Sequence, residues 1–237
     1  MTSTVPQFSG MGYFDFLKLM NDNLQPKSYF EIGTQNGYSL AQFSCDAVCV
    51  DPAFQISSNV WSSRKQTHLF QMTSDEFFRN SSFVSSLWPQ GIDIAFLDGL
   101  HRFEALLKDF FNTEALCHSQ SAIVLHDCLP TSLEQLPRYS DTGVNWTGDV
   151  WKLLPILKLH RPDLRVHVVD TPPTGLVVIT NLNPKSTVLR HNYYSIIDAF
   201  APMELDEEGM IQLRTMYPMV DSNALYSAKS NWNLLFG

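Results

Sequence analysis

The sequence predicts an α/β domain with a doubly wound, mostly parallel sheet of seven strands, the last of them antiparallel. Short runs of almost continuously apolar residues recur along the chain, as strands buried on both faces require. Segments with helical periodicity lie between most of these runs, which is typical of parallel strands joined by crossovers. The last two runs are separated only by residues 170–175, which predicts a hairpin and an antiparallel edge. The seven runs are residues 28–32, 47–50, 68–71, 92–97, 122–125, 166–169 and 176–179.

The clearest predicted helix follows the fourth strand. Its apolar residues, from Phe103 to Ala115, recur at the spacing i, i+3, i+4, i+7, i+8. Glu104, Lys108 and Asp109 fall between these positions, so we expect them on the outer, solvated face. A long polar segment, residues 129–147, leaves the fifth strand, and loops of this length in compact domains are usually functional lids or disordered.

Length, charge and cysteine content narrow the classes of function. A chain of 237 residues corresponds to about 1.6 average domains. We therefore expect one domain over residues 1–183 and a C-terminal extension over 184–237 that packs on the core or on a partner subunit, as in a homodimer. The net charge of −8, without a Lys/Arg cluster, argues against nucleic acid and membrane as partners. The N-terminus lacks a secretory pattern and the four cysteines form no C-x-x-C, which predicts a cytoplasmic protein with reduced thiols.

Acidic residues and a histidine lie at the carboxyl ends of several predicted strands. In open parallel sheets, ligands bind beyond these ends, at the switch in strand order. So many titratable residues at strand ends indicate a ligand site rather than a purely structural sheet. These residues are Glu31, Asp51, Asp98, His126 and Asp127.

The first strand runs into a glycine turn, Gly33 to Gly37, with the spacing G-x-x-x-G. Such a turn before a helix lets a ligand approach the backbone and the N–H groups of the helix start. It is not the G-x-G-x-x-G of dinucleotide sites, and the chain has no Tyr-x-x-x-Lys, so an NAD-dependent oxidoreductase is disfavoured. Asp51, 18 residues after Gly33, ends the second strand, where a carboxylate accepts from both ribose hydroxyls. The combination fits a cofactor with an adenosine half and no phosphates, such as S-adenosylmethionine.

Four motifs, taken in order, resemble a class I S-adenosylmethionine-dependent methyltransferase. They are E-I-G-x-x-x-G-x-S from Glu31, V-D-P around Asp51, F-L-D-G-L-H-x-F-E from Phe96, and V-L-H-D ending at Asp127. The likeness extends to the bacterial branch with D-G-x-H and H-D motifs, methyltransferase family 24, and covers about residues 25–180. It implies a Rossmann-like sheet and an enzyme that transfers a methyl group to a small-molecule acceptor, with a hydroxyl as the expected target. The identity of the acceptor stays open.

The resemblance also implies which residues bind the cofactor. Residues at the end of the first strand would lie along its methionine part, Asp51 would bind the ribose, and the third strand end would edge the adenine. Asp75 is an equally good helix cap at that point. The implied cofactor residues are Glu31, Gly33, Thr34, Gly37, Ser39, Asp51, Met72, Thr73, Ser74 and Asp98.

The acceptor side depends on two aspartates and two histidines. Catechol-type and sugar-hydroxyl relatives hold Mg²⁺ with acids at these strand ends, and a hard cation prefers oxygen ligands. The resemblance thus implies a metal set of Asp98, His126 and Asp127, which needs a bend because successive strand residues point to opposite faces. Without a metal, His101 is the candidate general base, close in sequence to Asp98. The candidate catalytic residues are therefore His101, Asp98 and Asp127.

Two positions depart from the metal-dependent relatives. Leu100 stands where sugar methyltransferases carry a second acid, and Cys128 stands where catechol-type enzymes carry an asparagine ligand. Metal binding therefore stays open, and so does a second function, a non-catalytic subunit that binds S-adenosylmethionine or supports assembly. An acceptor cleft filled by side chains would mark that alternative. Residues near the end of the long segment are expected to wall the acceptor pocket or to form a lid: Trp146, Asp149 and Trp151 as walls, Arg138 and Tyr139 as lid residues.

Overall fold

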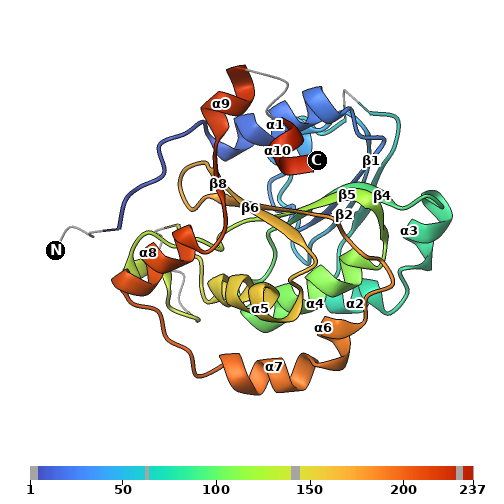
Figure 1. Cartoon of the computed structure of the whole chain (residues 1–237). Helices are drawn as coiled ribbons and strands as arrows, with labels where there is room; N and C mark the ends of the chain where they lie inside the picture. Colours follow the sequence, from blue (N-terminus) through green and yellow to red (C-terminus); the bar gives the residue numbers. More distant parts are fainter. Residues whose placement is uncertain (1–4, 62–63, 140–144, 228–231, 237) are drawn as a thin grey trace.

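The computed structural model describes residues 5–61, 64–139, 145–227 and 232–236. Within them the chain forms one eight-stranded sheet in the order β3-β2-β1-β4-β5-β7-β6-β8 (Figure 1). Strands β1 to β5 run parallel, β7 is antiparallel to both β5 and β6, and β8 is parallel to β6. The strands are β1 (Ser28–Ile32), β2 (Asp46–Val50), β3 (Thr67–Phe70), β4 (Ile92–Leu97), β5 (Cys117–Leu125), β6 (Arg165–Asp170), β7 (Leu176–Thr180) and β8 (Met219–Asp221).

The predicted count of seven strands is wrong by one, because the C-terminal extension contributes β8. This strand pairs with β6, so the sheet ends on β8 and not on the predicted hairpin. Only the middle one of its three residues is buried, and so short a strand leaves no alternation to recognise. The antiparallel pairing of β6 and β7 is confirmed.

Helices cover both faces of the sheet (Figure 1). One face carries α1 (Tyr13–Leu24), α9 (Ser222–Ser227) and α10 (Asn233–Phe236), with Phe16 and Leu17 of α1 fully buried. The other face carries α2 (Ser74–Phe78), α4 (Phe103–Glu114) and α5 (Leu153–His160). The remaining helices are α3 (Ser82–Leu87), α6 (Val188–His191), α7 (Tyr193–Phe200) and α8 (Glu207–Thr215).

The helix expected after the glycine turn does not form. Between β1 and β2 the chain makes only a single 3₁₀ turn, Leu40–Gln42. Gln35 and Gly37 have φ angles of 42° and 81°, in a left-handed conformation that interrupts a right-handed helix. On this face the ring of Trp232, from the C-terminal extension, stacks on Phe16 with their centroids 6.0 Å apart. The extension therefore covers part of a face that has no α-helix between β1 and β2.

Helix α4 follows the predicted periodicity with two exceptions, Asp109 and Ala115, of which Ala115 is exposed and lies after the last helical residue. Phe103, Leu107 and Phe110 are buried as predicted, but Asp109, predicted on the outer face, is only 3% exposed. Helix α2 packs on this side of α4, and Ser74 at its start hydrogen-bonds the Asp109 carboxyl. Burial disfavours the charged form and raises the pKa of Asp109 to about 7.

The residues after 183 contribute β8 and pack on the same core as the rest of the chain. In the described part of the chain, no helix combines the length and apolar character needed to cross a membrane. The boundary at residue 183, the cytoplasmic location and the homodimer stay predictions.

Candidate active site

A cleft of about 800 Å³ opens where the carboxyl ends of β1, β2, β4 and β5 meet. This volume is typical of small-molecule sites, and the cleft is open rather than filled by side chains, which argues against the non-catalytic alternative. Within the described parts of the chain, its lining residues include no lysine or arginine. Its titratable lining residues are Asp51, Asp75, Asp98, His101, His126 and Asp127.

The glycine turn after β1 forms one wall of the cleft through Gly33. Its φ angle is 88°, and a Cβ at this position would lie 1.9 Å from the carbonyl oxygen of Asp98. Only glycine accepts both constraints, because a side chain would collide with the backbone at the end of β4. Gly33 therefore lets the turn after β1 contact Asp98, which the sequence predicts on both the cofactor side and the acceptor side.

Four other predicted cofactor residues do not line the cleft: Glu31, Thr34, Gly37 and Ser39. The Glu31 carboxyl is fully buried and accepts hydrogen bonds from the hydroxyls of Thr34, at 3.1 Å, and Ser39. Burial raises the pKa of Glu31 to about 7, against the opposite effect of these two hydrogen bonds. In this structure the four residues shape the turn, and their contact with a cofactor stays a prediction.

Asp51 lies at the end of β2, where the sequence predicts a ribose-binding acid. Its Oδ2 accepts the backbone N–H of Gln35 at 2.8 Å, and its Oδ1 accepts that of Ala53 at 2.7 Å. These two bonds fix the carboxylate against the glycine turn. Each oxygen keeps a further lone pair, so Asp51 retains the capacity to accept from two ribose hydroxyls.

The three residues after β3 that are predicted to lie along the edge of the adenine do not all line the cleft. Thr73 and Ser74 line the cleft, whereas Met72 packs against the hydrophobic core. Thr73 is the N-cap of α2, accepting the N–H of Glu76 at 3.2 Å in a capping box. The alternative prediction, that Asp75 caps this helix, is wrong, because the Asp75 carboxylate pairs with Lys108 of α4.

The three predicted catalytic residues, His101, Asp98 and Asp127, lie together on the acceptor side of the cleft. His101 Nε2 lies 3.6 Å from Asp98 Oδ1 and 3.3 Å from Asp127 Oδ2. His126 Nδ1 contacts the same two carboxylates, at 3.3 Å from Asp98 and 3.1 Å from Asp127. Two imidazoles therefore flank two carboxylates at the ends of β4 and β5. Thr174 Oγ1 donates to the other Asp127 oxygen at 2.9 Å and orients it.

The bend that the metal hypothesis requires is present at Asp127. Its φ angle is 58°, a left-handed conformation that is uncommon for a non-glycine residue. This turn lets the side chains of His126 and Asp127 approach the same Asp98 carboxylate, although they are consecutive. A strained backbone at this point is a feature that clusters at functional sites.

Electrostatics favour the anion of Asp98 and raise the pKa of both imidazoles in this cluster. Burial alone disfavours the Asp98 anion, but His126 and His101 outweigh it and lower the pKa of Asp98 to about 2. Burial also opposes charging of His101, yet its hydrogen bond with Asp98 and the charge of Asp127 raise its pKa. The same two carboxylates raise the pKa of His126 against its burial.

The residues whose ligand atoms converge for a cation differ in one member from the predicted metal set. One ligand atom each from Asp98, His101 and Asp127 lies within 4.8 Å of the others. His126 contacts both carboxylates but lies outside this group, and its role as a metal ligand stays a prediction. Two carboxylates and an imidazole are a chemically suitable donor set for a divalent cation.

Tyr13 at the start of α1 is a site neighbour that the sequence does not reveal. Its ring packs on His126 with the centroids 4.4 Å apart. Burial, then the charges of Asp98 and Asp127, raise the pKa of its phenol. An amphipathic pattern over residues 13–24 would have predicted the helix, but not that its first residue reaches the ends of β4 and β5.

The predicted acceptor walls are only partly found in the cleft. Trp146 lines it, with its ring 4.8 Å from that of His101, and Leu100 lines it with 53% of its surface exposed. Trp151 and Cys128 are instead buried in the hydrophobic core. Asp149 lies outside the lining, in an ion-pair network with Arg138, one of the predicted lid residues. Residues 140–144 of the long segment lie outside the described residues.

This sheet order, with a cleft over the strand ends and an acid after β2, agrees with the predicted class I S-adenosylmethionine-dependent methyltransferase. A family model described as a methyltransferase domain, Methyltransf_24, matches residues 30–128, which confirms the likeness to family 24 and the predicted class of enzyme. A comparison with curated proteins finds no match.

Two solved structures have the same fold. One is cofactor-bound Rv0187 from MTB, with a TM-score of 0.51 and 13% identity over 75% of this chain and 84% of that one. The other is a putative caffeoyl-CoA O-methyltransferase from Staphylococcus aureus, with a TM-score of 0.52 and 16% identity over 75% of this chain and 86% of that one. At these identities the likeness establishes the Rossmann-like methyltransferase fold.

Proposed function

We propose that the protein transfers the methyl group of S-adenosylmethionine to a hydroxyl of a small-molecule acceptor, and that His101 removes the hydroxyl proton. The observation that carries this proposal is the position of His101 Nε2, which lies 3.3 Å from Asp127 and 3.6 Å from Asp98 in an open cleft. The staphylococcal neighbour is described as a putative O-methyltransferase, and an oxygen acceptor agrees with that description.

The residues of this chain contribute position and a proton acceptor. S-adenosylmethionine, when bound, supplies a methyl group already activated on a sulfonium. Asp51 and the turn at Gly33 would hold the adenosine half, which leaves the Asp98–His101–Asp127 group for the acceptor. The two carboxylates raise the pKa of His101 and stabilise the imidazolium that forms when it takes up the hydroxyl proton. Holding the two reactants in line supplies much of the remaining rate.

The same three residues would hold a divalent cation, which defines a second form of this mechanism. A bound cation would lower the pKa of an acceptor hydroxyl and would make His101 a ligand in place of a base. The two carboxylates suit Mg²⁺, the predicted cation, and equally Mn²⁺.

The test is calorimetric titration of S-adenosylmethionine into metal-stripped protein, followed by transfer of labelled methyl to a panel of phenols, sugars and amines. We expect micromolar cofactor binding and labelling of hydroxyl acceptors. EDTA and added Mn²⁺ or Mg²⁺ separate the two forms, because only the cation form loses activity with the chelator. Absence of cofactor binding, or transfer to amines alone, would refute the proposal.

A matched histidine variant provides the control. His118 forms a comparable pair with Asp93 at 2.9 Å, at the opposite end of β4 and β5. We expect His101→Gln to lower kcat by about 10²- to 10⁴-fold, the usual contribution of a general base. His118→Gln should leave kcat unchanged, and equal losses in the two variants would contradict a role for His101 in the chemistry.

A further inference from the structure

We infer that Asp149 is a positioning residue for His101, and that Arg138 and Lys152 hold Asp149 in place. The inference rests on the proposed role of His101. Neither Asp149 nor its two cationic partners line the cleft, so their effect on the reaction would be indirect.

Helix α4 begins at Phe103, two residues after His101, and has no side-chain cap from its own N-cap residue. Its N-cap residue, Arg102, makes no side-chain capping hydrogen bond. Instead the first N–H of the helix, that of Phe103, donates to Asp149 Oδ1 at 3.0 Å. A residue distant in sequence thus supplies the cap that satisfies a helix N-terminus and complements its dipole. The position of the helix start, and of the histidine before it, therefore depends on Asp149.

The segment that carries Asp149 also encloses His101 directly. The backbone N–H of Asp149 donates to the His101 carbonyl at 3.4 Å. A Cβ on Gly148 would lie 2.0 Å from that carbonyl oxygen, and its φ angle of 56° suits glycine. Trp146 places its ring against the imidazole. Residues 146–149 thus fix the backbone of His101 and one face of its ring.

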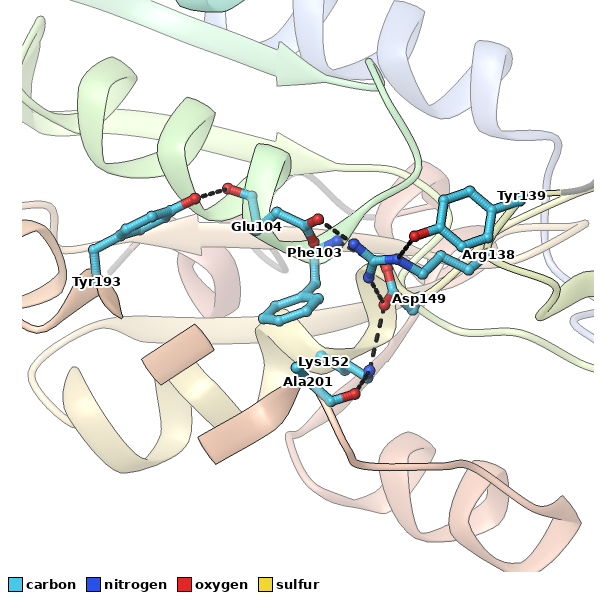
Figure 2. A network of polar contacts seen from close by, with 8 residues as sticks. All are labelled: Phe103, Glu104, Arg138, Tyr139, Asp149, Lys152, Tyr193 and Ala201. Carbon is cyan, nitrogen blue, oxygen red and sulfur yellow. Dashed lines mark hydrogen bonds and ion pairs between the residues drawn. The ribbon is translucent and has the colours of Figure 1, made fainter. Parts of the chain in front are cut away.

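The second oxygen of Asp149 is held by two cations (Figure 2). Arg138 binds Asp149 Oδ2 and also Glu104 in the first turn of α4, and Lys152 Nζ lies 3.3 Å from the same oxygen. Lys152 also donates to the carbonyl of Ala201 at 3.0 Å, which connects the network to the C-terminal extension. Two cations and two carboxylates balance in charge, so each charge in this largely buried group has a partner.

The two contacts of Arg138, with Asp149 and with Glu104, suit an arginine for a geometric reason. Separate nitrogens of the Arg138 guanidinium contact Asp149 and Glu104, and so fix the long loop to the helix start along two directions. A lysine keeps the charge but lacks this planar fork. The position of the His101 imidazole is therefore expected to depend on the shape of the Arg138 side chain as well as on its charge.

The test compares Asp149→Asn and Arg138→Lys with Arg190→Gln. Arg190 of α6 also bonds α4, through Asn112 at 2.7 Å, but near the other end of the helix, which makes it a matched control. Because small errors of position are costly in catalysis, we expect kcat to fall roughly 10- to 100-fold in Asp149→Asn and less in Arg138→Lys. The Kd for S-adenosylmethionine should change less than about twofold in both, since the Asp51 side of the cleft is untouched.

A readout independent of turnover is the NMR spectrum of the histidine rings. Asp149→Asn and Arg138→Lys should move the His101 ring signals and leave those of His118 in place, whereas Arg190→Gln should move neither. If His101 signals move but no acceptor is methylated by any variant or by the unaltered protein, the proposed function fails and the positioning role stands. The positioning role is overturned if His101 signals and kcat stay unchanged, or if only the melting temperature falls. Should Asp149→Asn fail to fold, Arg138→Lys decides alone.

Discussion

Replacing Asp109 by asparagine is expected to stabilise the protein at pH 8 and to change its stability little near pH 4. Asp109 is 3% exposed between α4 and α2, and burial raises the pKa of its carboxyl to about 7 from an ordinary 3.8. Two groups lower this pKa against the effect of burial: the Ser74 hydroxyl, which hydrogen-bonds the carboxyl, and the charge of Lys108. An asparagine keeps an oxygen for that hydrogen bond and removes the charge that burial disfavours.

The sign follows from the protons that each state binds. Between about pH 4 and pH 7 the folded protein keeps the Asp109 proton that the unfolded chain has lost, so stability falls as pH rises through this window. The difference between 3.8 and about 7, at about 1.4 kcal/mol per pH unit, amounts to roughly 4 kcal/mol as an upper value. Above about pH 7 the difference should be constant, because Asp109 is then ionised in both states.

The assay is urea unfolding of both proteins at intervals from pH 4.5 to pH 8.5. The quantity compared is the difference in unfolding free energy between Asp109→Asn and the unaltered protein at each pH. Subtraction removes the effect of other titrating groups, including Glu31, whose pKa is also raised to about 7. A difference that does not change between pH 5 and pH 7 would refute the assignment of a raised pKa to Asp109.

Three further variants test other parts of the structure. Gly33→Ala should abolish binding of S-adenosylmethionine in calorimetry while the protein stays folded by circular dichroism, because its Cβ would meet the Asp98 carbonyl at 1.9 Å. Arg161→Ala should lower the unfolding free energy by roughly 3–5 kcal/mol, since it leaves the buried Glu114 carboxylate without its bidentate partner at 2.6 and 2.8 Å. Trp232→Ala should cost roughly 3–5 kcal/mol in urea unfolding, and a loss below 1 kcal/mol would show that Trp232 does not hold the C-terminal extension on α1.

The strand ends that form the cleft could be predicted because they combine two strong signals. Continuous apolar runs mark buried parallel strands, and a polar residue directly after such a run has to lie at the carboxyl edge. Asp51, Asp98 and Asp127 were found in this way, and all three line the cleft. The left-handed backbone at Asp127 was not predictable, because an aspartate in this conformation has no signature in the surrounding sequence.

Other parts of the site depend on tertiary contacts that periodicity does not report. Periodicity identifies one apolar stripe on a helix, but α4 packs against both the sheet and α2, so the polar Asp109 is buried as well. The cap on α4 comes from Asp149, far along the chain, whereas sequence signals for capping are local. Tyr13 contacts His126 because α1 packs on one face of the sheet and begins next to the end of β5.

The shortened connection after β1 bears on which cofactor the cleft accepts. A helix start at this point would present free N–H groups and a positive dipole end, which favour phosphate. Here the chain turns at Gln35, and the backbone N–H of that residue is already bound by the Asp51 carboxylate. Among the described residues that line it, the cleft presents four aspartates and two histidines but no lysine or arginine. This acidic lining opposes the pyrophosphate of a dinucleotide and attracts a sulfonium. The missing helix start removes N–H groups that would bind phosphate. Both observations favour S-adenosylmethionine over NAD⁺.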